Sequence, residues 1–154
     1  MDDDLPAPDY RALLEFRYAI RSFLHFSEES ARAAGIEPQQ HQLMLAIKAG
    51  GDGESRIGDL AELLKLRHHS TVELIDRLVA NGFAERQRAE TDRRQVHVHL
   101  TEAGEHVLRD LSERHSEQLR SDGPELLRVL QEITKIERTE GERQAANSSP
   151  VGAR

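Results

Sequence analysis

Hydrophobic residues near the N-terminus recur every three or four positions, which is the spacing of one helix face. The pattern predicts a helix over residues 9–34 that ends at Gly35, and a second helix from Pro38 to the glycine-rich stretch 50–53. The apolar stripe of the first helix is wider than one core contact requires. We therefore expect this helix to pair with a second copy of the chain, the alternative being a helix enclosed within one domain.

Two shorter helical patterns follow in the centre of the chain. The first, IGDLAELLKL, places Leu60, Leu63 and Leu64 at helical spacing, and Gly58 can serve as its N-cap. The second, RHHSTVELIDRLVANG, has an apolar face and ends at Asn81-Gly82, because glycine adopts the left-handed conformation of a helix C-terminus. The core residues expected on this face are Val72, Ile75, Leu78 and Val79.

Strict alternation in QVHVHL predicts a strand with Val96, Val98 and Leu100 on its buried face. A preceding strand is expected from Phe83 to about Arg88, joined to it by the polar tip 89–94. The two strands would form a β-hairpin whose tip projects into solvent.

After the hairpin, Thr101 can cap a helix that runs to about Ser121. Asp122-Gly123-Pro124 is expected to break this helix before a last helix begins. We expect the helices within residues 102–138 to take part in dimerisation. Residues 1–8 are expected to be flexible and residues 141–154 to be a disordered tail, since neither has a periodic apolar face.

This order of elements predicts a mainly α fold with a small β-hairpin wing, an α+β winged helix-turn-helix flanked by N- and C-terminal dimerisation helices. The main domain would span residues 9–140 and its DNA-binding lobe about 55–104. In such folds the second helix of the motif enters the DNA major groove and the hairpin lies beside it. The expected DNA contacts are His68, His69, Ser70, Thr71, Glu73 and Arg77 on the recognition helix, and Arg86, Arg88, Asp92, Arg93 and Arg94 on the wing.

The run Asp92-Arg93-Arg94-Gln95-Val96-His97-Val98-His99-Leu100-Thr101-Glu102-Ala103-Gly104 resembles the wing signature of the MarR (multiple antibiotic resistance regulator) family. Leu60-Ala61-Glu62, Ser70-Thr71-Val72, Asp76-Arg77-Leu78 and Gly82 match the same family. The close likeness covers about the central third of the chain. His68-His69 depart from it, since small or polar residues usually stand there.

The resemblance implies a homodimeric transcriptional regulator, usually a repressor, that binds a pseudo-palindromic operator in double-stranded DNA. It also implies that Asp92 pairs with Arg94 in the wing, and that Arg93 or Arg94 reaches the minor groove. Members often respond to a small aromatic or other organic effector. A winged-helix module that binds a protein partner instead of an operator is the alternative from another functional class.

The net charge of −7 is unusual for a DNA-binding protein, but its distribution is uneven. Between residues 56 and 100 there are eight basic and seven acidic residues, so the acidity lies in the remainder of the chain. Cysteine is absent, which excludes disulfides and a reactive thiol. The acidic N-terminus and the lack of a long apolar run favour a cytoplasmic protein without a membrane span.

Eight histidines raise the possibility of a metal site or an enzyme. We expect neither a catalytic residue nor a cofactor, because no nucleophile motif, phosphate-binding loop or His-Glu-x-x-His is present. His25, His41, His106 and His115 lie outside the recognition elements, with Glu28, Glu29 and Glu37 as possible partners. His41 and His115 stand at positions loosely similar to zinc ligands of metal-sensing MarR proteins, so a metal-responsive regulator is a further alternative, although surface or core histidines are the simpler interpretation.

Overall fold

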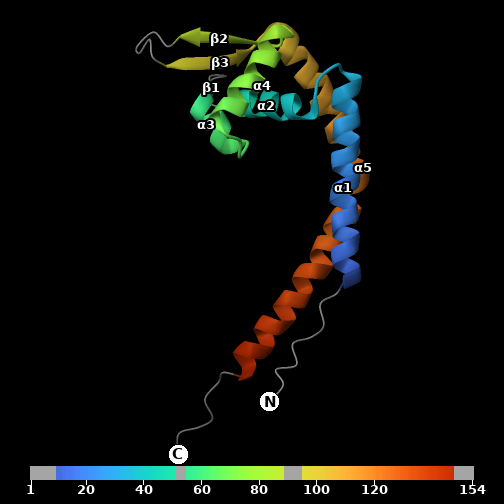
Figure 1. Ribbon diagram of the computed structural model, residues 1–154. Coiled ribbons are helices and arrows are strands. Elements are labelled where there is room, and N and C mark those ends of the chain that lie inside the picture. The colour runs from blue at the N-terminus through green and yellow to red at the C-terminus, as the bar shows by residue number, and fades with distance from the viewer. Residues whose placement is uncertain (1–9, 51–54, 89–94, 148–154) are drawn as a thin grey trace, which may run out of the picture. The chain divides into compact units, whose positions relative to one another are not determined.

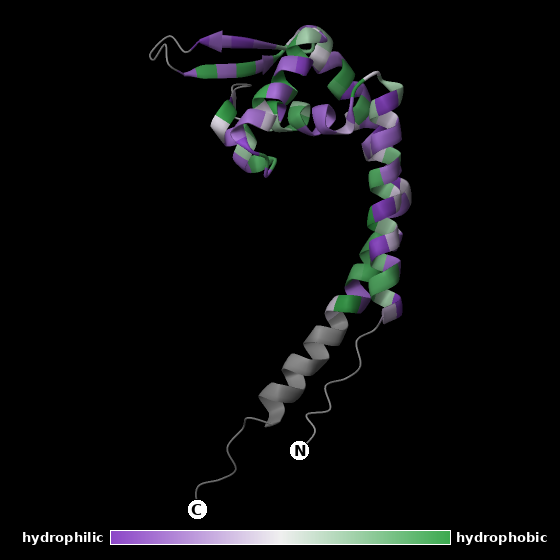
Figure 2. Cartoon of the chain, in the orientation of Figure 1, coloured by the Kyte–Doolittle hydropathy of each residue, from purple (hydrophilic) through white to green (hydrophobic). Residues whose placement is uncertain are grey.

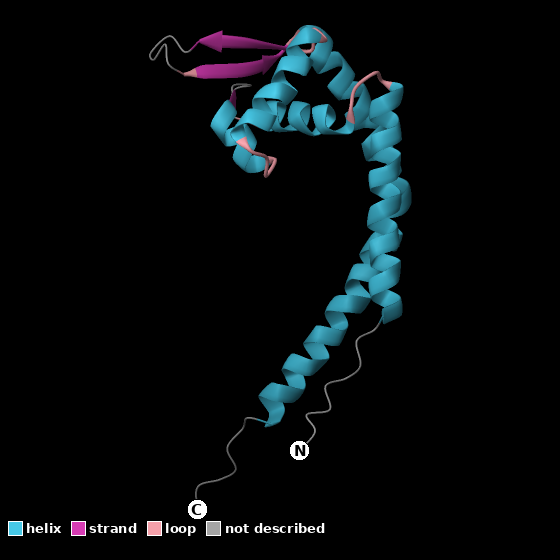
Figure 3. Ribbon diagram, viewed as in Figure 1, coloured by secondary structure: helices cyan, strands magenta, loops and turns pink. Residues whose placement is uncertain are grey.

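The computed structural model describes residues 10–50, 55–88 and 95–147 (Figure 1). Its elements are, in order, α1 (Tyr10–Ala33), α2 (Pro38–Ala49), β1 (Ser55–Arg56), α3 (Ile57–Leu63), α4 (His68–Ala80), β2 (Ala84–Arg88), β3 (Val96–Leu100) and α5 (Glu102–Asn147). Helices dominate and the strands form one small sheet, as Figure 3 shows, which confirms the predicted fold class. Within the described ranges, no helix combines the length and apolar composition that a membrane span requires.

The chain divides into two compact units. The central unit is residues 26–116, and the terminal unit comprises residues 1–25 together with 117–154. Both α1 and α5 contribute residues to each of the two units.

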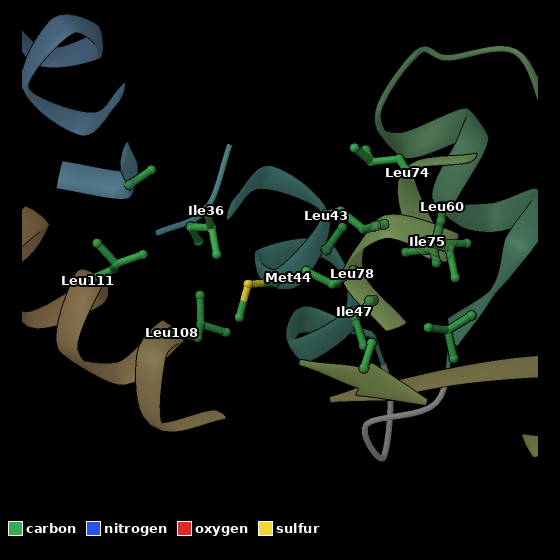
Figure 4. Packing of buried hydrophobic residues seen from close by; sticks show 14 residues of the cluster. Ile36, Leu43, Met44, Ile47, Leu60, Leu74, Ile75, Leu78, Leu108 and Leu111 are labelled. Atoms are coloured by element: carbon green, nitrogen blue, oxygen red, sulfur yellow. The ribbon is translucent and has the colours of Figure 1, made fainter. Parts of the chain in front are cut away.

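The core of the central unit is built where α2, α4 and the first turns of α5 meet (Figure 4). Leu43, Ile47 and Leu78 are fully buried, and Met44 extends toward Leu108 of α5. Other members include Ile36, Leu60, Leu74, Ile75, Val98 and Leu111. Burial of each large aliphatic side chain contributes about 1.5–3 kcal/mol, so this cluster fixes the helices that carry the recognition elements.

The sheet has three antiparallel strands in the order β1-β3-β2. β3 is central, pairing Val98 with Ser55 on one side and with Arg86 on the other. The hairpin of β2 and β3 confirms the predicted wing strands. β1 was not predicted, because a strand of two residues is too short to show an alternating pattern.

Three helices end in the same way, with one residue in the left-handed conformation. At Gly35 and Gly82 φ is +78° and +76°, and the following N–H bonds back to the carbonyl five residues earlier. In the turn between α3 and α4 the equivalent position is Lys65, with φ of 53°. The tight helix-turn-helix connection therefore carries backbone strain that a glycine would avoid.

Thr101 joins the end of the wing to α5. Its hydroxyl donates to the Gly82 carbonyl at 2.6 Å and accepts from the Gly104 N–H at 3.1 Å, so it caps α5 as expected. Its own N–H donates to the carbonyl of Phe83 at 3.1 Å. The Leu-Thr-x-x-Gly part of the wing signature thus has a structural role at this junction.

In the terminal unit, α1 and α5 contact each other through small and charged side chains. Ala12 and Val129 are buried, and Arg128 binds Glu15 of α1 at 3.2 Å as well as Glu125 and Glu132 on its own helix. Several large apolar residues of this unit remain exposed, and Figure 2 shows hydrophobic patches along both helices.

The expected break at Asp122-Gly123-Pro124 was wrong, because α5 continues through Pro124. Helix also covers residues 141–147, which we expected to be disordered. These residues are mostly Glu, Arg, Gln and Ala, whose helix propensity is high even without an apolar face.

Two expectations for α3 also need correction. The helix has Arg56 at its N-cap, while Gly58 lies within the first turn. Leu63 is exposed, so of Leu60 and Leu63 only Leu60 belongs to the core.

Candidate nucleic-acid interface

The start of α4 presents the polar run expected for a recognition helix. His68 and His69 are exposed and Ser70 is partly buried. One and two turns further along, Glu73 and Arg77 are exposed as well, while Leu74, Ile75 and Leu78 hold the opposite face in the core. The five polar residues therefore follow one accessible side of the helix.

The first backbone N–H groups of α4 are also available. Its N-cap is Arg67, whose side chain makes no capping hydrogen bond, and the Thr71 N–H is the first to bond back, to the Arg67 carbonyl. Free N–H groups at a helix start attract anions, because the helix dipole adds a partial positive charge.

Thr71, which was expected to contact DNA, lies on the buried side of α4. Its side chain is fully buried, and its hydroxyl donates to the Arg67 carbonyl at 3.1 Å. This hydrogen bond to the preceding turn stabilises the start of α4.

On the wing, the register of β2 against β3 decides where the arginines lie. Residues directly opposite each other share one face of the sheet, and Ala84, Arg86 and Arg88 lie opposite Leu100, Val98 and Val96. Val98 and Ala84 are buried, so this face is directed toward the helices.

Arg86 makes an ion pair with Asp76 of α4, the guanidinium Nη1 lying 2.5 Å from the carboxylate Oδ1. Arg88, further out on the same face, is exposed. The expected tip residues Asp92, Arg93 and Arg94 lie outside the described residues.

The recognition elements contain functional candidates that the sequence analysis did not list. Arg56, Lys65 and Arg67 are exposed and lie at the start of α3 or in the turn before α4. Their positive charge adjoining the helix-turn-helix was the available signal. Asp76 belongs to the Asp76-Arg77-Leu78 match to the family, but the sequence alone does not show that it pairs with Arg86.

His41 and His115 form a buried pair in the central unit. Their rings stack with centroids 4.9 Å apart, and Phe26 packs edge-on against His115 at 5.8 Å. Burial, with a smaller contribution from the charge of His115, lowers the pKa of His41 to about 4. Burial also lowers the pKa of His115, opposed by a hydrogen bond with the backbone of Ser27.

Of the three carboxylates considered as metal partners, two form ion pairs on α1. Glu28 and Glu29 bind Arg32 at 3.3 and 2.9 Å, and His106 lies 3.6 Å from Asp110. Among the described residues no three His, Asp or Glu side chains gather as a metal site would require. The stacked rings of His41 and His115 are buried in the core of the central unit.

Comparison with known proteins gives the same assignment for the central unit. Residues 34–95 match the MarR family. The chain is 38% identical over 77 residues to the uncharacterized HTH-type transcriptional regulator YfiV of Bacillus subtilis (strain 168). The aligned part is 50% of this chain and 46% of YfiV, so the chain spans about half the length of this curated relative.

Solved structures show the same fold. AbsC, a MarR family transcriptional regulator from Streptomyces coelicolor, superposes with a TM-score of 0.66 at 22% identity, covering 89% of this chain and 92% of AbsC. A MepR mutant of S. aureus bound to an oligodeoxyribonucleotide gives 0.63 at 16% identity, covering 84% and 94%. Over residues 34–95 the sequence is thus similar to the MarR family of transcriptional regulators, and the fold is the winged helix-turn-helix of the solved MarR family structures.

Proposed function

We propose that the chain is a homodimeric, sequence-specific DNA-binding regulator, a repressor that a small organic effector releases from its operator. The main support for this proposal is that one core holds two exposed elements next to each other. These are the exposed polar start of α4 and the β2–β3 hairpin, which joins α4 through the Asp76–Arg86 ion pair.

In this proposal α4 lies in the major groove. His69, Glu73 and Arg77 face base edges or phosphates along the accessible side of the helix, and the free N–H groups at its start bind a phosphate. Arg88 and the sequence-identified tip, Asp92, Arg93 and Arg94, provide the wing contacts. MepR, of the same fold, is described as bound to an oligodeoxyribonucleotide.

The charge distribution supports a local electrostatic contact. Exposed basic residues accompany the recognition elements, namely Arg56, Lys65, Arg67, Arg77 and Arg88, although the whole chain carries −7. Binding should therefore weaken steeply with added salt, because phosphate contacts release counterions.

The terminal unit supports dimerisation through α1 and α5. Leu14 and Tyr18 are 68% and 72% exposed, and Leu127 on α5 is 61% exposed. Together with Leu126 and Val129, the first two line a cavity of about 640 Å³ in this unit. Exposed apolar surface of this kind favours association, and a second copy offers the same apolar helices.

In the proposed dimer, an effector would release DNA by changing the distance between the two recognition helices. A ligand that binds better to one spacing of these helices shifts the protein toward that spacing by its differential affinity. The MarR family resemblance favours an aromatic or other organic acid as this ligand.

The decisive experiment is a gel shift with a duplex that covers the promoter region beside the chain's own gene. We expect salt-sensitive binding that Arg77→Ala and Arg94→Ala weaken at least severalfold, since each removes one DNA contact. Arg114→Ala is the matched control, because Arg114 is an exposed arginine on α5. Absence of wild-type binding, or equal loss in the control, would contradict the proposal.

A further inference from the structure

The ion pair between Asp76 and Arg86 joins the exposed side of the recognition helix to the base of the wing. The two charged groups are 2.5 Å apart, and their side chains are 56% and 31% exposed. We propose that Arg86 is a positioning residue, which holds the wing to α4 through Asp76 and does not itself bind phosphate. This inference rests on the proposed DNA-binding function.

The strand register explains why Arg86 reaches Asp76. Along the helix-facing side of β2, Ala84 is buried, Arg86 comes next and Arg88 is exposed. Arg86 therefore stands where the sheet leaves the core, directly opposite the fully buried Val98. From this position its side chain reaches Asp76 of α4, while Arg88, two residues further along β2, is exposed.

The ion pair also accounts for a carboxylate on the DNA-facing helix. Asp76 is exposed on α4 beside Arg77, where an uncompensated negative charge would repel phosphates. Arg86 neutralises that charge. A single contact thus both fixes the wing and removes a repulsion.

The two possible roles of Arg86 predict opposite effects of Asp76→Asn on DNA affinity. If Arg86 is a phosphate ligand, loss of the nearby carboxylate removes repulsion, and binding becomes tighter. If Arg86 positions the wing, loss of its partner loosens the hairpin, and binding becomes weaker even though a negative charge has been removed. The sign of the change therefore distinguishes the roles.

The test is a double-mutant cycle of Asp76→Asn and Arg86→Gln, with affinity for the promoter duplex measured at several salt concentrations. We expect each single variant to bind about two- to fivefold more weakly, as for a partly exposed ion pair, and the double variant to be no weaker than the weaker single variant. Tighter binding by Asp76→Asn, or additive losses, would overturn the inference.

The salt dependence provides a second readout, with Arg88→Gln as the matched variant on the same strand. A lost phosphate contact lowers the slope of log affinity against log salt by about 0.9. We expect Arg86→Gln to keep the wild-type slope and Arg88→Gln to lower it. A slope reduced by that amount in Arg86→Gln would identify Arg86 as a phosphate ligand.

A measurement without DNA separates this inference from the proposed function. Amide hydrogen exchange in β2 should accelerate about two- to fivefold in both single variants of the free protein, while the amide of the buried Ile47 in α2 serves as internal reference. If wild-type protein fails to bind DNA but β2 exchange responds, the proposed function fails and the positioning contact stands. If β2 exchange is unchanged, the positioning role is wrong.

Discussion

Gly104 of α5 lies against the backbone of Phe83 so closely that a Cβ at residue 104 would overlap the Phe83 carbonyl oxygen. The same oxygen accepts the N–H of Thr101, so it is held in place and cannot move aside without loss of that hydrogen bond. The glycine of the wing signature is therefore required by packing, although it lies inside a helix.

Gly104→Ala should destabilise the protein by about 1–3 kcal/mol, because the added methyl group displaces backbone. Gly58→Ala in α3 is the matched control, since nothing lies within 4 Å of a Cβ there. That change should be neutral or stabilising, as alanine has the higher helix propensity. Urea unfolding of both variants checks this prediction, and similar unfolding free energies for the two would contradict it.

Lys65 and Gly82 occupy equivalent left-handed positions at helix ends, with φ of 53° and 76°. Lys65→Gly should therefore stabilise the protein by up to about 1 kcal/mol, and Gly82→Ala should destabilise it by a similar amount. Since a Cβ at residue 82 meets nothing within 4 Å, its cost comes from the backbone alone. Thermal or urea unfolding measures both, and a shift in the same direction would refute the strain at Lys65.

Stability should fall as the pH is lowered from about 6.5 toward 4, because His41 is buried in its neutral form. Its folded pKa of about 4 is below the ordinary 6.5, so the unfolded chain binds more protons in this window. The unfolding free energy should drop by up to about 1.4 kcal/mol per pH unit, and the contribution is fully present above pH 6.5.

His41→Phe retains an aromatic ring against His115 and should flatten this part of the pH dependence. A smaller slope should remain, because burial lowers the pKa of His115 as well. His106→Gln is the control, since the side chain of His106 is 71% exposed. Unfolding at pH 7, 6 and 5 gives the comparison, and equal slopes in wild type and His41→Phe would exclude His41 as the source.

Leu14→Glu should convert the proposed dimer to a monomer, because it places a charge in the exposed apolar surface of the terminal unit. Leu63→Glu is an equivalent change at a leucine of similar exposure on α3, 64% against 68%, and should leave the assembly unaltered. Sedimentation equilibrium measures the mass of each variant. A monomeric wild-type protein, or dissociation in both variants, would rule out this dimer surface.

Helix and wing positions could be predicted from the sequence because apolar spacing and glycine both act locally. The helix ends at Gly35 and Gly82, the hairpin strands and the cap at Thr101 all follow from such local signals. Which residues of the recognition helix are buried was harder to predict. Thr71 is polar and yet buried, because its hydroxyl donates a hydrogen bond to the preceding turn.

The remaining differences come from tertiary contacts and helix continuity. The pairing of Asp76 with Arg86 depends on strand register, and the stacking of His41 on His115 joins residues of two different helices. Pro124 indicated a break, but α5 continues through it. Asp92, Arg93 and Arg94 remain predictions of the sequence.

The junction at Thr101 limits how the chain can be engineered. A single hydroxyl links the turn after the recognition helix to the first turn of α5, and the adjoining N–H fixes the same segment to Phe83. A residue inserted between Leu100 and Gly104 would shift every one of these partners out of register. Tags, linkers or circular-permutation sites should therefore avoid this junction.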